Sequence, residues 1–488
     1  MDSLLPAPSS TEVTVAEVDG KLIQLRNASD PSIDFYVRAE GVLFQHLQMP
    51  ANLIHPDISR ITVKDLPSQK SLYGILHNGF MMLIETFYGI QNLVQTLGQS
   101  FPPNFISNAI FNTDTQRHML SLEEELKEYP ANLLAWHPYV SIFAIAHKDD
   151  AIFLYDLRTE TWFPEILENE LLQKDITCMS WKPLGGNILA VGCKNGICLW
   201  EISLEQKKVS KNGPFRFDAW MRYINYPGHE NIVSLAWHPH GSYPLLFIIY
   251  YLFIICGSAD GSIILWNTSF GNGTILTTNR KVAFLSWSPI GEILFSSFLD
   301  GKIEIWETQR WTSKIINVPT PFRHPVQTAC WTKDGRVLFL SFCEDQCIRS
   351  LSITPNLDVE WLPEEYMSFS IECNGRTVKQ LAIDPTGERL VVCFKDTPLL
   401  VVFHAKQPTL VPRGSNLLSV QGIVRGPKWR EPGEEDTTGE TFFMSKPDPK
   451  AVSINFAKHF MKGALLSLIW EDGQISFLPF YFRPTTGK

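Results

Sequence analysis

The stretch that decides the fold begins with Cys178-Met-Ser-Trp-Lys-Pro183 and continues through Leu189-Ala-Val-Gly192, Asn195-Gly196 and Ile197-Cys-Leu-Trp-Glu201. Three apolar segments are separated by a proline-containing turn and an Asn-Gly pair, and the first and third contain a tryptophan near their ends. Asn-Gly favours the positive backbone angles of a two-residue hairpin turn. The stretch therefore predicts three consecutive antiparallel β-strands.

The same pattern recurs along the chain in four clear copies and three weaker ones. The clear copies begin at Leu134-Ala-Trp-His-Pro138, Cys178-Met-Ser-Trp-Lys-Pro183, Leu235-Ala-Trp-His-Pro239 and Leu285-Ser-Trp-Ser-Pro289. The weaker copies begin at Ala329-Cys-Trp-Thr332, Leu381-Ala-Ile-Asp-Pro385 and Val452-Ser-Ile-Asn-Phe456. Trp136 and Trp181 are 45 residues apart, and Trp287 and Trp331 are 44 apart. This spacing matches the ~40–45-residue period of WD repeats.

Seven copies predict a ring of seven small sheets. Each sheet can pack against a neighbour on both faces, and closing the ring leaves no long exposed strand edge. We therefore predict an all-β fold, a seven-bladed WD-repeat β-propeller over residues 131–482, with an N-terminal β-hairpin and a helical extension.

The hairpin is predicted within residues 1–30. Val13-Thr-Val-Ala-Glu-Val18, the Asp19-Gly20 turn and Lys21-Leu-Ile-Gln-Leu25 have the pattern of two short strands. The last repeat copy supplies only three strands, which would leave its sheet with an open edge. We expect the hairpin to complete the last blade.

The helical extension is predicted for residues 31–130. Apolar residues there recur at steps of three and four, as on one face of a helix. The ridge consists of Leu72, Leu76, Phe80, Leu83 and Phe87, and it continues to Leu97 before Pro102-Pro103. The ridge either lies across the propeller or faces a partner helix, and it is our candidate for a partner-facing element.

Two segments interrupt the repeats. Residues 404–450 are rich in Pro, Gly, Glu and Thr, and we expect them to form a largely flexible loop between the sixth and seventh blades. Pro244–Ile255 is wholly apolar but well below the ~20 residues of a membrane-spanning helix. It is either an extended buried strand pair or a translated intron in the gene model.

Charge and cysteine content exclude several classes of function. The formal net charge is −9 and no run of Lys and Arg is present, which argues against a nucleic-acid-binding protein. The N-terminus lacks the pattern of a signal peptide, and we expect a soluble chain without a transmembrane span. The nine cysteines are scattered without the second pair that a zinc site requires, so we expect buried thiols and no metal or cofactor.

One set of polar residues has two interpretations. His229, Ser258, Asp260 and Trp266 occupy the spacing of a hydrogen-bond network inside one WD-repeat blade. A catalytic interpretation would make His229 a base oriented by Asp260, with Ser258 as the nucleophile. The spacing favours the structural network, and no Gly-x-Ser-x-Gly motif is present. We therefore expect no enzyme activity and no catalytic residues.

The repeats also carry a more specific resemblance. Its residues include Ser180-Trp-Lys-Pro-Leu184, Asp384-Pro-Thr-Gly-Glu-Arg-Leu390, Lys462-Gly-Ala-Leu-Leu-Ser467 and Leu478-Pro-Phe-Tyr-Phe482. Over residues 130–482 the chain resembles the aladin family of WD-repeat nucleoporins. It departs from that family in the Pro244–Ile255 segment and in lacking a proline-rich tail after the last strand.

The resemblance implies a non-enzymatic scaffold or adaptor of the nuclear pore complex at the nuclear envelope. Its partners would be other proteins, among them a transmembrane nucleoporin, so membrane contact would be made only through a partner. The implied role is support of nucleocytoplasmic transport. The alternative from the fold alone is a WD-repeat adaptor of another assembly, such as a ubiquitin ligase or a trafficking coat.

Overall fold

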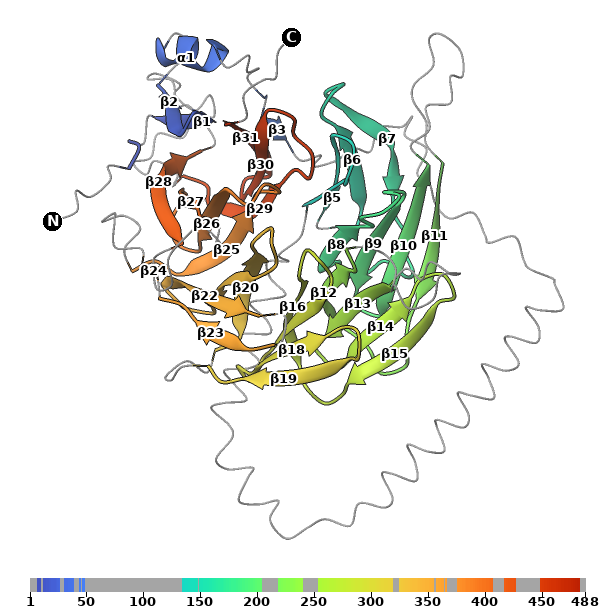
Figure 1. Ribbon diagram of the computed structural model, residues 1–488. Helices are drawn as coiled ribbons and strands as arrows, with labels where there is room; N and C mark the ends of the chain where they lie inside the picture. The colour runs from blue at the N-terminus through green and yellow to red at the C-terminus, as the bar shows by residue number, and fades with distance from the viewer. Residues whose placement is uncertain are drawn as a thin grey trace, which may run out of the picture.

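The computed structural model describes residues 7–9, 12–26, 30–38, 44, 46–48, 134–147, 149–203, 218–239, 253–318, 324–354, 357–363, 365–366, 375–406, 417–426 and 448–482. Seven sheets, antiparallel except where β1 (Val13–Val18) pairs with β31 (Gln474–Tyr481), are arranged around a common centre and run from teal to red in chain order, with the blue N-terminal strands added to the last (Figure 1). The chain is therefore a seven-bladed β-propeller, as the repeat count predicted.

Each blade is built from strands that follow one another in sequence. Blades one to three are β4 (Leu134–Trp136), β5 (Ile142–Ala146), β6 (Ile152–Asp156) and β7 (Thr161–Leu167); β8 (Cys178–Trp181), β9 (Ile188–Cys193), β10 (Gly196–Ser203) and β11 (Asp218–Ile224); and β12 (Ile232–Trp237), β13 (Phe253–Ser258), β14 (Ile263–Asn267) and β15 (Asn272–Thr277). Blade four is β16 (Val282–Trp287), β17 (Ile293–Phe298), β18 (Ile303–Glu307) and β19 (Thr312–Ile316).

The later blades follow the same plan with additions. Blade five is β20 (Val326–Trp331), β21 (Val337–Phe342), β22 (Cys347–Ile353), β23 (Val359–Trp361) and β24 (Glu365–Tyr366), and blade six is β25 (Val378–Ile383), β26 (Arg389–Phe394), β27 (Leu399–Ala405) and β28 (Leu418–Arg425). Blade seven joins β29 (Ala451–Phe456), β30 (Gly463–Trp470) and β31 (Gln474–Tyr481) to β1 (Val13–Val18), β2 (Lys21–Leu25) and β3 (Leu47–Gln48). Helix α1 (Ser32–Arg38) packs on the β1–β2 hairpin.

The core lies between the blades. Every residue of β9, β17, β21 and β26 is buried, because the second strand of a blade is covered on both faces by the neighbouring sheets. Blades three and four approach each other so closely that one position requires glycine. A Cβ added to Gly257 in blade three would lie 2.5 Å from Val282 in blade four. The outer strands β15 and β19 are more exposed, so in blades three and four burial falls from the centre of the blade to its rim.

The tryptophans that end the inner strands of blades two to four join each of these blades to the one before it. The indole N–H of Trp181 donates to the carbonyl oxygen of Ala135 at 3.0 Å, and that of Trp237 donates to the carbonyl oxygen of Ser180 at 3.0 Å. In both cases the acceptor immediately precedes the tryptophan of the previous blade. In blades two to four the repeated tryptophans therefore supply both buried apolar surface and a hydrogen bond to the preceding blade.

The ring closes between blades seven and one. Each inner strand contacts the next in the order β4, β8, β12, β16, β20, β25 and β29, and β29 contacts β4. The Trp136 indole donates to the hydroxyl of Ser467 in β30 at 2.9 Å, and the Asn455 amide donates to the carbonyl oxygen of Leu134 at 2.8 Å. These contacts join the first blade to the last.

The N-terminal hairpin supplies the fourth strand of blade seven. β1 lies parallel to β31, with Glu17 opposite Phe480 and Val18 opposite Tyr481, whereas the fourth strands of the other blades are antiparallel to the third. The amide of Arg425 in β28 also donates to the hydroxyl of Thr14 at 3.2 Å. The hairpin therefore contacts blade six as well as blade seven.

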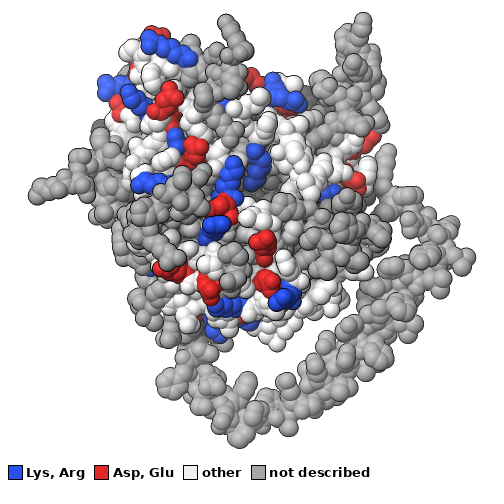
Figure 2. Space-filling model, viewed as in Figure 1, with Lys and Arg blue, Asp and Glu red and all other residues white. Residues whose placement is uncertain are grey.

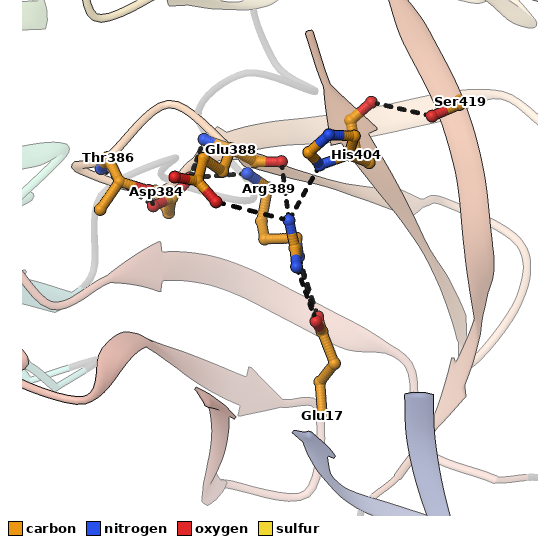
Figure 3. Close-up of polar contacts among 7 residues, drawn as sticks. All are labelled: Glu17, Asp384, Thr386, Glu388, Arg389, His404 and Ser419. Carbon is orange, nitrogen blue, oxygen red and sulfur yellow. Dashed lines mark hydrogen bonds and ion pairs between the residues drawn. The ribbon is translucent and has the colours of Figure 1, made fainter. Parts of the chain in front are cut away.

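A buried ion pair joins the hairpin to blade six (Figure 3). The Arg389 guanidinium at the start of β26 lies 2.8 Å from the Glu17 carboxylate, and both side chains are less than one-tenth exposed. The same guanidinium contacts His404 Nδ1 at 2.9 Å and the carbonyl oxygen of Glu388 at 3.3 Å. Because Arg389 also stacks over Phe482, its charge is enclosed on several sides.

Two boundaries predicted from sequence require correction. Residues 404–450 are not one loop, because β27 extends through Ala405 and Leu418–Arg425 forms β28, the outer strand of blade six. The Pro244–Ile255 segment is not wholly an insertion either. Its last residues belong to β13, where Trp237 lies opposite Ile254. In blade four, Trp287 lies opposite Leu294, which is seven residues later in the chain. In blade three, Trp237 lies opposite Ile254, which is seventeen residues later. The connection in blade three is therefore ten residues longer than the one in blade four.

The helical extension is described only in part. Helix α1 and strand β3 belong to it, and β3 pairs with β31 at Ile475. The ridge of Leu72, Leu76, Phe80, Leu83 and Phe87 lies outside the described residues.

We predict that Glu17→Ala lowers the free energy of unfolding by about 3 kcal/mol, because it leaves the buried Arg389 charge without its carboxylate. Urea denaturation followed by circular dichroism measures the loss. The control is Glu12→Ala in the same hairpin, which removes an ion pair to the exposed Arg26 and should cost less than about 1 kcal/mol. Equal losses in the two variants would contradict a stabilising role for the buried pair.

Candidate functional site

The inner strands surround a cavity of about 870 Å³ along the axis of the ring. Strands and turns of blades two to seven line it. Hydroxyl and amide side chains face it between its two ends, including Ser180, Ser234, Ser286, Thr328 and Asn455. The cavity wall therefore mixes polar side chains with apolar ones from the inner strands.

One end of the cavity is bordered by the turns that follow the inner strands. These turns carry the prolines of the repeated motif, which are Pro183, Pro239, Pro289 and Pro385. The residues after such prolines are exposed in three blades: Tyr139 by 52%, Leu184 by 45% and Ile290 by 46%. The Tyr139 hydroxyl donates to the carbonyl oxygen of Pro183 at 2.6 Å, which fixes adjacent turns of blades one and two. This end of the ring presents ordered apolar side chains to solvent.

The charged residues of the cavity wall are mostly basic. They are the five lysines Lys333, Lys379, Lys395, Lys450 and Lys458 and the three acids Asp384, Asp396 and Glu471. All come from blades five, six and seven, in a chain whose formal net charge is −9. The cavity therefore has one basic side.

The polar network predicted in blade three passes through a cysteine. Nε2 of His229 lies 2.9 Å from the sulfur of Cys256, and the indole of Trp266 donates to the same sulfur at 3.0 Å. Nδ1 of His229 is hydrogen-bonded to the hydroxyl of Ser262. His229 and Trp266 are thus joined through Cys256 in β13.

Ser258 joins this network through the hydroxyl of Ser262 at 3.5 Å, whereas Asp260 has a different partner. The Ser258 hydroxyl accepts from the amide of Gly261 at 3.3 Å, and Asp260 accepts from the side-chain amide of Asn231 at 3.3 Å. The path therefore differs from the one predicted from sequence. The role of Cys256 could have been inferred from the next repeat. There Ser296 occupies the equivalent position in blade four and accepts the indole hydrogen bond of Trp306.

The described geometry gives no support to the catalytic interpretation of these residues. Burial lowers the pKa of His229 to about 4, so the imidazole is neutral at neutral pH and a poor base there. Its contacts are to Cys256 and Ser262, while Asp260 is bonded to Asn231. The set therefore acts as a structural link between strands.

The cysteines of the described ranges are reduced and mostly buried. Burial raises the pKa of Cys178 and of Cys393 to about 12 and also raises that of Cys256. Such thiols stay protonated at neutral pH and are poor nucleophiles. Within the described ranges no group of His, Cys, Asp and Glu has the arrangement of a metal site.

Among the helices that the structure describes, none is long and apolar enough to cross a membrane.

Two family models match the repeats. The model described as WD domain, G-beta repeat matches residues 221–267, which include most of blade three. The model described as Anaphase-promoting complex subunit 4 WD40 domain matches residues 134–237, which include blades one and two. The chain is a WD-repeat protein.

A curated relative extends the similarity of this WD-repeat chain beyond the repeats. Aladin of Arabidopsis thaliana is 25% identical over 502 residues, an alignment that covers 98% of each chain. The similarity therefore includes the N-terminal region as well as the ring, and the chain resembles aladin over nearly its whole length.

Solved structures of low identity also resemble the ring. The β-propeller domain of Cps50 (Swd1) from Myceliophteria thermophila has a TM-score of 0.49 at 14% identity, covering 72% of this chain and 96% of that one. A chain of a mitotic checkpoint complex has a TM-score of 0.47 at 15% identity, covering 72% of this chain and 86% of its own. The assignment of a propeller rests on the seven sheets of this WD-repeat chain.

We predict that His229 makes stability fall as the pH drops from about 6.5 to about 4. Its pKa is lower in the folded state, so the unfolded chain binds more protons in this window. Between pH 7 and pH 5 the free energy of unfolding should therefore fall by about 2 kcal/mol because of His229. Urea titrations at both pH values measure the difference. In His229→Gln the loss between the two pH values should be smaller by that amount, and an unchanged pH dependence would contradict the prediction.

Proposed function

We propose that this WD-repeat chain is a non-enzymatic scaffold of the nuclear pore complex at the nuclear envelope. It binds other nucleoporins, including a transmembrane one through which it contacts the membrane, and it supports nucleocytoplasmic transport. The observation that carries the proposal is the similarity to aladin across 98% of both chains.

The geometry of the ring supports a binding role. Its seven sheets bury their apolar faces against one another, and the indole and imidazole groups described above have partners inside the ring. A closed ring of this kind is stiff, so its turns and rims can dock partners with little change of shape. The fold thus fits a scaffold that holds other proteins.

The sequence also distinguishes this role from that of a permeability-barrier component. The one Phe-Gly dipeptide in the sequence is Phe270-Gly271. It forms the turn between β14 and β15, with Phe270 exposed. A single dipeptide fixed in a hairpin turn lacks the repetition and the unfolded setting of Phe-Gly nucleoporins, which favours the scaffold role.

The second candidate is an adaptor of another assembly, such as a ubiquitin ligase or a trafficking coat. One observation supports this alternative: residues 134–237 match a family model described as Anaphase-promoting complex subunit 4 WD40 domain. Cellular location separates the two candidates. A pore scaffold is concentrated at the nuclear rim, whereas an adaptor of the other kind is not.

We predict that the fluorescently tagged full chain gives a continuous nuclear-rim signal in cells. Proximity labelling from the same tag should recover nucleoporins, including one with membrane spans. A diffuse cytosolic signal together with recovery of ubiquitin-ligase or coat subunits would reject the pore assignment in favour of the alternative.

We predict that Leu83→Asp combined with Phe87→Asp weakens the rim signal several-fold, because both substitutions place charge on the apolar ridge proposed to face a partner. The control is Leu171→Asp on the exposed connection between β7 and β8, which should leave the rim signal unchanged. Thermal melting of the purified variants shows whether the ring is folded. Full rim localisation of the folded double variant would reject a partner-facing ridge.

A further inference from the structure

We propose that the axial cavity binds an acidic segment of a partner protein, held by the lysines of blades five to seven. The inference deepens the scaffold function proposed above and rests on it, since it names the chemistry of one partner. Figure 2 shows Lys and Arg side chains interspersed with Asp and Glu over the middle of the face in view. In Figure 1 the inner strands of the blades meet in this region.

The lysines lie at both ends of the cavity wall. Lys379 is near the start of β25, Lys395 directly follows β26, and Lys450 directly precedes β29, so these three share the end at which the inner strands begin. Lys333 and Lys458 follow β20 and β29 and lie at the opposite end. An acidic ligand in the cavity therefore meets positive charge at each end.

The carboxylates of the wall already accept hydrogen bonds from the protein. Asp384 accepts from the amides of Glu388 and Arg389, both at 2.7 Å. Asp396 accepts from the hydroxyl of Thr377 at 3.3 Å. Glu471 accepts from the backbone amide of Lys450 at 3.2 Å. The acids thus hold the turns of the wall in place, and the excess charge left facing the cavity is positive.

The positive charges of Lys379, Lys395 and Lys450 lie close enough together to repel one another. Nζ of Lys379 donates to the carbonyl oxygen of Ala451 at 3.0 Å. Burial lowers the pKa of Lys379, Glu471 acts in the opposite direction, and the positive charges of Lys395 and Lys450 lower it further. Within the described ranges, no ion pair joins the side chain of Lys450, Lys333 or Lys458 to a carboxylate. A bound anion would relieve this repulsion.

The length of the cavity favours a peptide over a small anion. The inner strands β20, β25 and β29 each have six residues, and such a strand spans about 20 Å. A phosphate-sized anion reaches the lysines of only one end, whereas an extended peptide of six or so residues reaches both. Between the ends, the hydroxyls of Ser180 and Ser286 line the cavity and offer hydrogen-bonding groups to a peptide backbone.

One tryptophan packs in the cavity wall near the second set of lysines. Trp331 ends β20, lines the cavity and is 6% exposed, and its indole N–H has no hydrogen-bond partner among the described residues. The equivalent indoles of Trp181 and Trp237 donate to the preceding blade. The Trp331 N–H has no accessible surface of its own, so this side chain packs blade five against blade four, and the groups open to a ligand are the lysines and hydroxyls of the wall.

The test uses the purified full chain and a fluorescein-labelled peptide of alternating Glu and Ser, about twelve residues long and therefore able to span the cavity. The control peptide has Gln at each Glu position. Fluorescence anisotropy should show saturable binding of the Glu peptide, which weakens as salt is raised, and no binding of the Gln peptide. Equal binding of both peptides, or binding of neither, would overturn the proposal.

The site is tested by Lys395→Glu combined with Lys450→Glu, which should raise the Kd for the Glu peptide at least about tenfold. Lys395→Arg combined with Lys450→Arg should retain binding, because the charge is kept. The matched control reverses two lysines outside the cavity, Lys21 and Lys314, to Glu. If this control weakens binding as much as the first variant, the effect is that of net charge and the proposal fails.

Folding and small anions complete the test. Circular dichroism and thermal melting show whether each variant is folded, and if the Glu variant unfolds, Lys395→Gln with Lys450→Gln should still raise the Kd by at least about threefold. Stoichiometric binding of inorganic tripolyphosphate without binding of the Glu peptide would assign the cavity to a small anion instead. The peptide-binding assay does not depend on where the protein lies in the cell. A failure to bind the Glu peptide would therefore leave the pore assignment unaffected. Conversely, a loss of nuclear-rim localisation would not change a measured peptide affinity.

Discussion

A propeller blade is too thin to bury both of its faces by itself, so each of the seven sheets depends on the packing of a neighbour on either side. This mutual burial requires the ring to close, and blades seven and one meet through the indole of Trp136 on Ser467 and the amide of Asn455 on Leu134. Blade seven in turn takes its fourth strand from the N-terminal hairpin, which the Glu17–Arg389 ion pair attaches to blade six. The contacts that close the ring therefore join residues that are far apart in the sequence.

Closure also decides where function can reside. The second strands β9, β17, β21 and β26 are buried throughout, and the network of His229, Cys256 and Trp266 satisfies its polar groups inside blade three. What remains accessible is the rim, the turns bearing Tyr139, Leu184 and Ile290, and the axial cavity with its basic side. These surfaces suit the binding of proteins, which agrees with the similarity of the whole chain to aladin and with the scaffold function proposed here.

Much of the ring could be predicted from short-range signals. The tryptophans and the Asp-Gly and Asn-Gly turns specify hairpins locally, and their period specifies seven blades. The errors came where a strand lacks such signals. Strand β28 is set in a Pro- and Gly-rich region, and its pairing with β27 comes from completing blade six. Likewise Phe253–Ile255 continues an apolar run whose strand boundary is set by pairing with β12.

The sequence by itself determined the repeat, the all-β class, the number of blades and the turn residues, because these depend on contacts between residues close along the chain. The tertiary structure decided which polar groups meet across the ring. Glu17 and Arg389 are 372 positions apart, and Trp136 and Ser467 are 331 apart. The gathering of Lys379, Lys395 and Lys450 on one wall likewise requires two blades to be packed side by side. Only closure of the ring brings such residues together, because no local preference of the backbone encodes their distance.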